Sequence, residues 1–502
     1  MPQYKFVAIK GGEKKPSKPS GSIRSHAIRA GLQKSTHPSR AKAAQSVRSR
    51  TSRGEFIIHL EPHGGVQDEA KPGILLADST TPEHTYRTLN TLLTPNILAE
   101  GSTELPICPI EFVYAGSVDP FNSLPVPMNP EVDFLVRYFL TKLDLNLAGA
   151  DRKRLWFPYA LQSAPMMHST LAMTAALWRA EYPALEYSVQ LEGIRQKGEA
   201  MRQIIARLAY ASSVQNNEEV SFLVSAMSTL VIVELRDGDF EAAEIHFRGV
   251  RHLYNSGGGH GSFNCEFILR KSINIADILF AAAMGHQLSF PLLRADQMCF
   301  PVSISEQARQ LQLDQSITND SSYSHDLIFV NLRQLLLARR SSMLSIETLR
   351  NQLNAVDALI LQHLYSDRID VSDSRRRSRA LVLAAHVFMY ITLRDVPPKS
   401  PLLRRMCTRL QTIIGSSPST SKTWTENRSV LLWVAFVGLL GTGHGTGSCP
   451  NGQWFLNLFH TVAKECSGDF HLGRGSIYRL LSNFLWDELH CQPLLADLVE
   501  HL

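Results

Sequence analysis

The stretch from Glu218 to Tyr254 reads EEVSFLVSAMSTLVIVELRDGDFEAAEIHFRGVRHLY and decides the fold class. Its two halves, Glu218–Leu235 and Phe240–Tyr254, place apolar residues at three- and four-residue spacing, which predicts two helices with buried faces. The intervening Arg236-Asp-Gly-Asp239 is so short that the two helices must form an antiparallel hairpin. This stretch therefore predicts helix-on-helix packing.

The same helical periodicity recurs from Pro130 to the C-terminus, without a convincing alternating strand pattern. Asn129 can cap the first helix, and Pro130 suits the first helical position. No period of roughly 34 residues, as in tetratricopeptide repeats, runs along the chain, so a regular solenoid is not expected. We predict an all-α fold, a compact multi-helix bundle of packed helical hairpins. The other expected helices cover Ser169–Glu181, Leu185–Tyr210, Phe267–Met284, Asp326–Leu337, Ile346–His363, Arg379–Tyr390, Leu402–Ile414, Ser429–Leu440, Trp454–Cys466 and Ser476–Glu488.

Composition divides the 502 residues into three expected parts. Residues 1–54 form a basic disordered arm, because too few large apolar side chains are present to offset the cost of ordering it. Residues 55–129 form a Pro/Gly-rich linker. Residues 130–502 form the helical domain, and the 44% of hydrophobic residues in the whole chain is enough for a large core.

Charge is concentrated in the arm. Met1–Arg53 contains thirteen Lys and Arg against Glu13 alone, a local net charge of +12, which leaves −7 for the rest of a chain whose total is +5. A basic arm favours a polyanionic partner, nucleic acid or an anionic surface, and nonspecific DNA contact would depend on salt. Base-specific readout needs a positioned helix or strand, and none is identified in the arm. The candidate contacts are Lys14, Lys15, Arg24, Arg29, Arg40, Lys42, Arg48, Arg50 and Arg53.

A second basic run, Arg375-Arg376-Arg377-Ser-Arg379, follows a polar stretch. Two interpretations stay open for it. Arg375, Arg376 and Arg377 form a nuclear-import signal or phosphate contact, or they are the solvated start of a helix.

The seven cysteines are widely scattered and show neither a disulfide framework nor a C-x-x-C pair, which favours a reducing compartment. The most apolar run, Val430–Leu440, is shorter than the roughly 20 residues that span a bilayer, so we expect a buried helix and no membrane insertion.

Chemical motifs are weak. Gly441-Thr-Gly-His-Gly-Thr-Gly447 has neither a preceding strand nor a following Lys-Ser or Lys-Thr, so we interpret it as an inter-helix loop and not as a phosphate loop. His444, Cys449, His460, Cys466, His471, His490 and Cys491 match no zinc spacing. No G-x-S-x-G or H-E-x-x-H is present. We therefore expect no catalytic, cofactor-binding or metal-ligating residues, and no enzyme activity.

Short motifs in a fixed order resemble the fungal-specific transcription factor domain, the regulatory region that follows zinc-cluster DNA-binding modules. The likeness covers about three-quarters of the chain, and His246-Phe-Arg-Gly249 with Leu253 and Gly257-Gly258 is its most family-like part. None of the motifs is catalytic, so the resemblance implies a regulatory and interaction domain. The other motifs are Leu155–Leu161 with Ser163-Ala-Pro165, Leu171–Leu177, Gln196–Ala200, Glu234–Asp239 and Phe484-Leu-Trp-Asp-Glu488.

The family's six-cysteine zinc cluster has no counterpart here, because Met1–Ile107 contains no cysteine. Our hypothesis is a nuclear transcription-factor-like regulator that acts through protein partners or a homodimer, with at most nonspecific DNA contact from the arm. The alternative is a helical interaction scaffold without a transcriptional role, and the cytoplasm is the alternative location. A more distant alternative is a helical enzyme with an unrecognised pocket.

Overall fold

The computed structural model describes residues 119, 123–142, 156–182, 187–211, 217–256, 267–292, 300–310, 323–341, 343–366, 373–415, 424, 427–443, 450–467 and 474–500. All of them belong to one compact unit, Thr80–Leu502. The predicted arm and nearly all of the predicted linker lie outside these residues, so the disorder of the arm and the role of the linker stay predictions.

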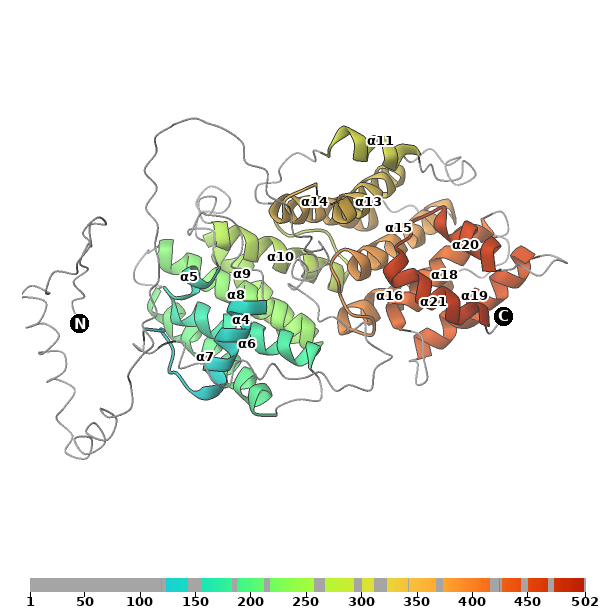
Figure 1. Cartoon of the computed structure of the whole chain (residues 1–502). Helices are drawn as coiled ribbons and strands as arrows, with labels where there is room; N and C mark the ends of the chain where they lie inside the picture. Colours follow the sequence, from blue (N-terminus) through green and yellow to red (C-terminus); the bar gives the residue numbers. More distant parts are fainter. Residues whose placement is uncertain are drawn as a thin grey trace, which may run out of the picture. The chain divides into compact units, whose positions relative to one another are not determined.

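Regular structure in the described ranges is α-helical throughout, which confirms the predicted fold class (Figure 1). The first helices pack around α8, which contacts α6, α7, α9 and α10. Their bounds are α4 Pro130–Lys142, α5 Trp156–Ala160, α6 Ala164–Glu181, α7 Tyr187–Ala211, α8 Asn217–Asp237, α9 Phe240–Ser256 and α10 Phe267–Met284.

The remaining helices pack around α18, which contacts α15, α16, α19, α20 and α21. The same core also joins the two sets of helices, because α10 contacts α14 and α16. The bounds are α11 Val302–Gln310, α13 Tyr323–Ser341, α14 Ile346–Tyr365, α15 Asp373–Thr392, α16 Pro401–Gly415, α18 Arg428–Thr442, α19 Pro450–Ser467, α20 Arg474–Ser482 and α21 Glu488–Glu500.

The two central helices are buried on all sides. Every residue from Phe222 to Leu235 of α8 and from Val430 to Thr442 of α18 is buried. A helix that is apolar all round belongs in the interior, because either helix would otherwise expose a large apolar surface to water. The apolar run Val430–Leu440 is therefore a core element, as predicted.

Local sequence signals set several helix boundaries. The Asn129 side chain accepts a hydrogen bond from the Val132 backbone N–H at 2.7 Å, which caps α4 directly before Pro130. Between α8 and α9, Gly238 takes a φ of +83°, a conformation that favours glycine, and Asp239 Oδ1 accepts from Ala242 N at 2.9 Å. The predicted hairpin is confirmed by the packing of α8 on α9.

One predicted helix is wrong. The expected helix Ser476–Glu488 ends at Ser482 as α20, and α21 begins only at Glu488. Between them, the carbonyl groups of Asn483, Phe484 and Leu485 accept hydrogen bonds from distant side chains, described below, and not from the following turn of a helix. Side-chain donors from other helices have thus taken the place of the backbone N–H groups of a continuing helix.

No helix within the described ranges is both long and apolar enough to cross a bilayer.

Candidate functional site

Three of the motifs that resemble the family, Gln196–Ala200, Glu234–Asp239 and His246–Gly249, meet in one ion cluster between α6, α7, α8 and α9. Glu234 of α8 is only 2% exposed, and its carboxylate lies 3.0 Å from Lys197 Nζ and 3.6 Å from His246 Nε2. Lys197 Nζ also lies 3.7 Å from the carboxylate of Asp237, which is paired with Arg179. Residues far apart in sequence thus form a single network.

Charge pairing keeps the central carboxyl group of this cluster ionised. Burial by itself raises the pKa of Glu234, but its contacts with His246 and Lys197 outweigh burial, and the net shift is downward. Breaking a buried pair leaves an uncompensated charge, so this arrangement fixes the relative positions of α7, α8 and α9. It is a structural cluster.

A second motif residue, Gln196, is fully buried between α6 and α7. Its amide oxygen lies 2.5 Å from His168 Nδ1, and its amide nitrogen donates to Glu192 Oε1 at 2.6 Å. Burial lowers the pKa of His168, and this effect exceeds the opposing hydrogen bond to Gln196. The imidazole is therefore neutral near neutral pH and serves as a core hydrogen-bonding group.

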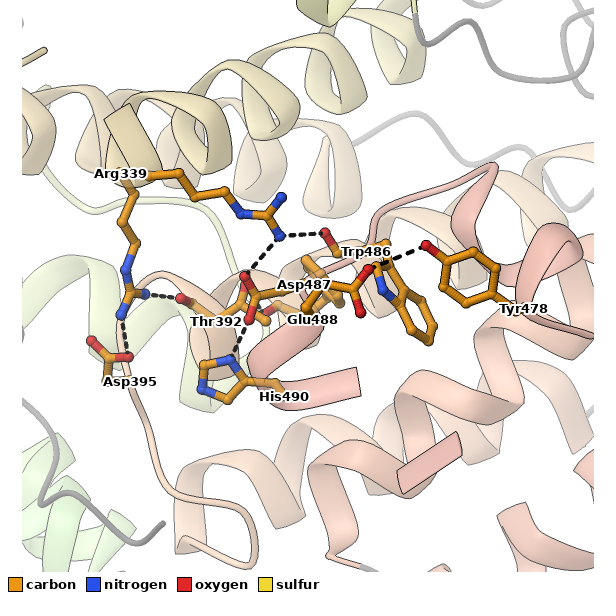
Figure 2. A network of polar contacts seen from close by, with 10 residues as sticks. Arg339, Thr392, Asp395, Tyr478, Trp486, Asp487, Glu488 and His490 are labelled. Atoms are coloured by element: carbon orange, nitrogen blue, oxygen red, sulfur yellow. Dashed lines mark hydrogen bonds and ion pairs between the residues drawn. The ribbon is translucent and has the colours of Figure 1, made fainter. Parts of the chain in front are cut away.

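The Trp486 motif lies in a network around the segment that joins α20 to α21 (Figure 2). Arg340 of α13 donates to the Trp486 carbonyl at 3.4 Å and lies 3.3 Å from Asp487 Oδ1. His490 Nδ1 lies 2.7 Å from the other Asp487 oxygen, and Tyr478 donates to Glu488 Oε1 at 3.2 Å. Polar contacts thus hold this non-helical segment from both sides.

Two further side chains reach the same segment from the core. Arg333 of α13 donates to the Asn483 and Phe484 carbonyls, each at 3.0 Å, and Trp433 Nε1 donates to the Leu485 carbonyl at 3.2 Å. Burial lowers the pKa of Arg333 to about 10, which still leaves the guanidinium charged at neutral pH. These contacts give buried carbonyl groups their partners.

The buried pair most similar to a catalytic dyad lies between α14 and α15. His386 Nε2 lies 2.7 Å from Asp357 Oδ1, and Arg394 Nε donates to Asp357 Oδ2 at 2.7 Å. Asp357 is 0% and His386 1% exposed, so no substrate reaches the imidazole in this arrangement. The buried network of His386, Asp357 and Arg394 holds α14 and α15 together.

Metal-capable residues do not converge in the described part of the chain. No group of three or more His, Cys, Asp and Glu is placed there to hold a metal ion. Cys491 is buried, which raises its thiol pKa to about 12, and His490 is paired with Asp487. His444, Cys449 and His471 lie outside the described residues.

Of the predicted basic contacts, the nine in the arm lie outside the described residues and stay predictions. Arg375, Arg376 and Arg377 lie in the first turns of α15, each partly buried and engaged with other groups of the chain. Arg375 donates to Ser366 Oγ at 3.3 Å. They stand at the start of a helix and are partly buried, and both interpretations, an import signal or phosphate contact and a solvated helix start, stay predictions.

Arg375 also borders a pocket of about 440 Å³. Its walls are the turn after α10 (Gly285–Gln287), the end of α14 (Leu364–Ser366), and Arg375 and Arg379 of α15. Gln287 donates to the Tyr365 carbonyl at 2.9 Å and links the first two walls. The arginines could be predicted from the sequence but the pocket could not, since its walls come from three separate segments.

The α7 helix carries an exposed apolar face that the sequence analysis missed. Tyr187 is 73%, Leu191 48%, Ile194 59% and Ile205 67% exposed, and Gly198 lies exposed between them. At about 100° per residue, all five fall within a strip roughly 60° wide. The signal was present in the sequence: α7 has one apolar stripe facing the core and a second stripe on the opposite side.

The chain matches the family model of the fungal specific transcription factor domain over residues 139–468. It therefore belongs to the fungal specific transcription factor domain family. This membership assigns the chain a role in regulating transcription, in a family that is non-enzymatic in general. No curated protein and no solved structure matches the chain.

Proposed function

We propose that this protein regulates transcription through protein contacts of its helical domain, and that the exposed apolar face of α7 makes those contacts. The exposed face, Tyr187, Leu191, Ile194 and Ile205, is the observation that carries the proposal. Contiguous apolar surface on a folded domain commonly marks an interaction site.

The free energy that burial of this face would contribute fits a partner surface of about the size of one helix. Burying a large apolar side chain contributes about 1.5–3 kcal/mol. Scaled by their exposed fractions, the four side chains would contribute roughly 5 kcal/mol in total. Association costs at least about 4 kcal/mol, so the face needs additional contacts around it for stable binding.

The spacing of the face favours another helix as its partner. Steps of four, three, four and seven residues from Tyr187 to Ile205 match the seam of a helix pair, in which apolar residues recur every 3.5 residues on average. Gly198, at which an added Cβ would meet nothing within 4 Å, leaves room for close approach near the middle of the seam. The partner helix belongs either to a second protein or to a second copy of this chain.

The sequence supports the remaining parts of the proposal. The protein acts in the nucleus, and any DNA contact by this chain is nonspecific contact from the basic arm, because its sequence contains no zinc-cluster pattern. An interaction scaffold without a transcriptional role is the competing function, and the two differ in whether the domain changes the output of a promoter.

The test replaces Leu191 and Ile194 by Glu in the full chain, fused to a heterologous DNA-binding domain upstream of a reporter gene. We expect reporter output to return to the level of the DNA-binding domain alone, because two carboxylates on the face prevent burial. The control carries Val302→Glu and Leu327→Glu, which lie on exposed positions of α11 and α13. It should keep the parent's output.

Sedimentation of the same proteins identifies the partner. A parent dimer that L191E/I194E converts to a monomer assigns the face to a second copy, whereas a monomeric parent assigns it to another protein. Equal reporter output from the parent and L191E/I194E would refute the role of α7. A parent without any effect on the reporter would favour the scaffold.

A further inference from the structure

The pocket lies among the turn after α10, the end of α14 and the start of α15, and three arginines are at or near it. Arg375 and Arg379 line it directly. Arg409 of α16 lies behind its wall, with the guanidinium carbon 5.9 Å from the centre of the Tyr365 ring. Gly285 permits this approach, because its φ is +82° and a Cβ there would lie 3.3 Å from that carbon and overlap Nη1.

Several guanidinium N–H groups at this place have no acceptor within the protein. Nε of Arg379, and Nε and Nη1 of Arg409, are buried and make no hydrogen bond, whereas Nη2 of Arg409 donates to the Ala282 carbonyl. Leaving a buried donor of a charged group unsatisfied is unfavourable. Burial, together with the nearby Arg405, lowers the pKa of Arg409. The local structure therefore favours an added acceptor.

A simpler explanation is that these arginines only offset the partial negative charge at helix C-termini. Helices α10 and α14 both end at the pocket, and each C-terminus is equivalent to roughly −0.5 elementary charge. Two such ends supply about −1 against three guanidinium groups, which leaves about +2. None of the described residues that line the pocket is acidic, and His286 adds a further group that can carry positive charge. Helix ends alone do not balance the site.

We propose that this pocket binds a small anion with at least two negative charges, held by Arg375 and Arg379, while Arg409 behind the wall adds positive charge. A cavity of about 440 Å³ falls in the range of small-molecule sites. Guanidinium groups bind carboxylate and phosphate oxygens through paired hydrogen bonds, so polycarboxylates and phosphate esters share the chemistry that fits. The ligand lies among the turn after α10, the end of α14 and the start of α15. The site is separate from the α7 face and does not depend on it.

The test is calorimetric titration of the full-length protein with citrate and, separately, with pyrophosphate, at millimolar concentrations and fixed ionic strength. Citrate and pyrophosphate distinguish the carboxylate from the phosphate source. We expect one of them to bind and R375Q/R379Q to weaken binding by roughly a hundredfold, because each charge-assisted hydrogen bond contributes about tenfold. The matched control R376Q/R377Q removes the same charge from the same helix turns, outside the pocket, and should bind like the parent.

A second variant avoids any loss of the arginines. Ser366→Glu places a carboxylate on the pocket wall beside Arg375, so it should abolish anion binding and raise the melting temperature. Parent protein that binds neither anion would overturn the proposal, because the chain's own groups would then already satisfy the arginines. Binding that both double variants weaken equally would overturn it as well, since the anions would then be bound by general charge and not by the pocket.

Discussion

The contact between α18 and α19 gives the sharpest prediction. A Cβ built on Gly438 of α18 would lie 2.6 Å from Cγ of Phe455, and closer still to Cδ1 and Cε1 of the same ring. Phe455 is 0% exposed, so the ring has little room to move. Replacing Gly438 by Ala should therefore strain the core, although alanine is the better helix former.

Two opposing effects set the change in the free energy of unfolding. Ala in place of Gly within a helix contributes about 1 kcal/mol of stability. Overpacking a well-packed core costs about 1–3 kcal/mol, and three overlapping ring atoms place Gly438→Ala near the upper end. The expected net loss is about 2 kcal/mol. With a urea m-value of about 3 kcal/mol/M, the midpoint of unfolding should fall by roughly 0.7 M.

Gly198→Ala is the matched control, because it makes the same chemical change in a helix with open space around the position. Its urea midpoint should rise by up to roughly 0.3 M, since only the propensity gain remains. Unfolding is followed by far-ultraviolet circular dichroism and by tryptophan fluorescence, to which the buried Trp433 contributes. A midpoint for Gly438→Ala at or above that of the parent would refute the close approach of α18 and α19.

Two further predictions concern pH. The Asp277 carboxylate accepts hydrogen bonds from the backbone N–H groups of Ser289 and Phe290, and burial raises its pKa to about 6. The folded state therefore binds the proton more tightly than the unfolded state. The free energy of unfolding should consequently fall as pH rises from about 4 to about 6. Asp277→Asn should flatten this decline by up to about 3 kcal/mol in urea titrations at each pH, and an unchanged slope would contradict it. Glu234→Gln should lower the free energy of unfolding at pH 7 by about 1–3 kcal/mol. Because the pKa of Glu234 is lowered in the folded state, this loss should shrink as pH falls below the ordinary pKa of a glutamate. Equal stability of Glu234→Gln and the parent at pH 7 would show that the ion cluster contributes nothing.

Local signals were sufficient for much of the fold. Asn129-Pro130 and Arg236-Asp-Gly-Asp239 each carry their own capping and turn chemistry, so the start of α4 and the α8–α9 hairpin followed from the sequence. The helix Phe267–Met284 has the predicted bounds. Such features depend on neighbours within a few positions, which a single sequence displays directly.

Long-range partners account for what the sequence did not reveal. The apolar periodicity continues through Phe484 and Leu485, yet Arg333 and Trp433 take the backbone carbonyl groups there and end α20 early. The pocket depends on the same kind of contact, because Arg379 meets the turn after α10 only in the folded chain. The spacing of residues along the chain does not indicate either of these long-range contacts.

The contacts of Arg333 and Arg340 with the segment before α21 also have a consequence for synthesis on the ribosome. Arg333 is bonded to carbonyl groups 150 and 151 residues further along the chain. In the nascent chain, Arg333 lacks these acceptors until about 150 further residues have been translated. A premature stop codon before Asn483 would therefore leave the buried Arg333 guanidinium without these acceptors, in a helix 150 residues upstream, and quality control would meet a defect in the middle of the domain.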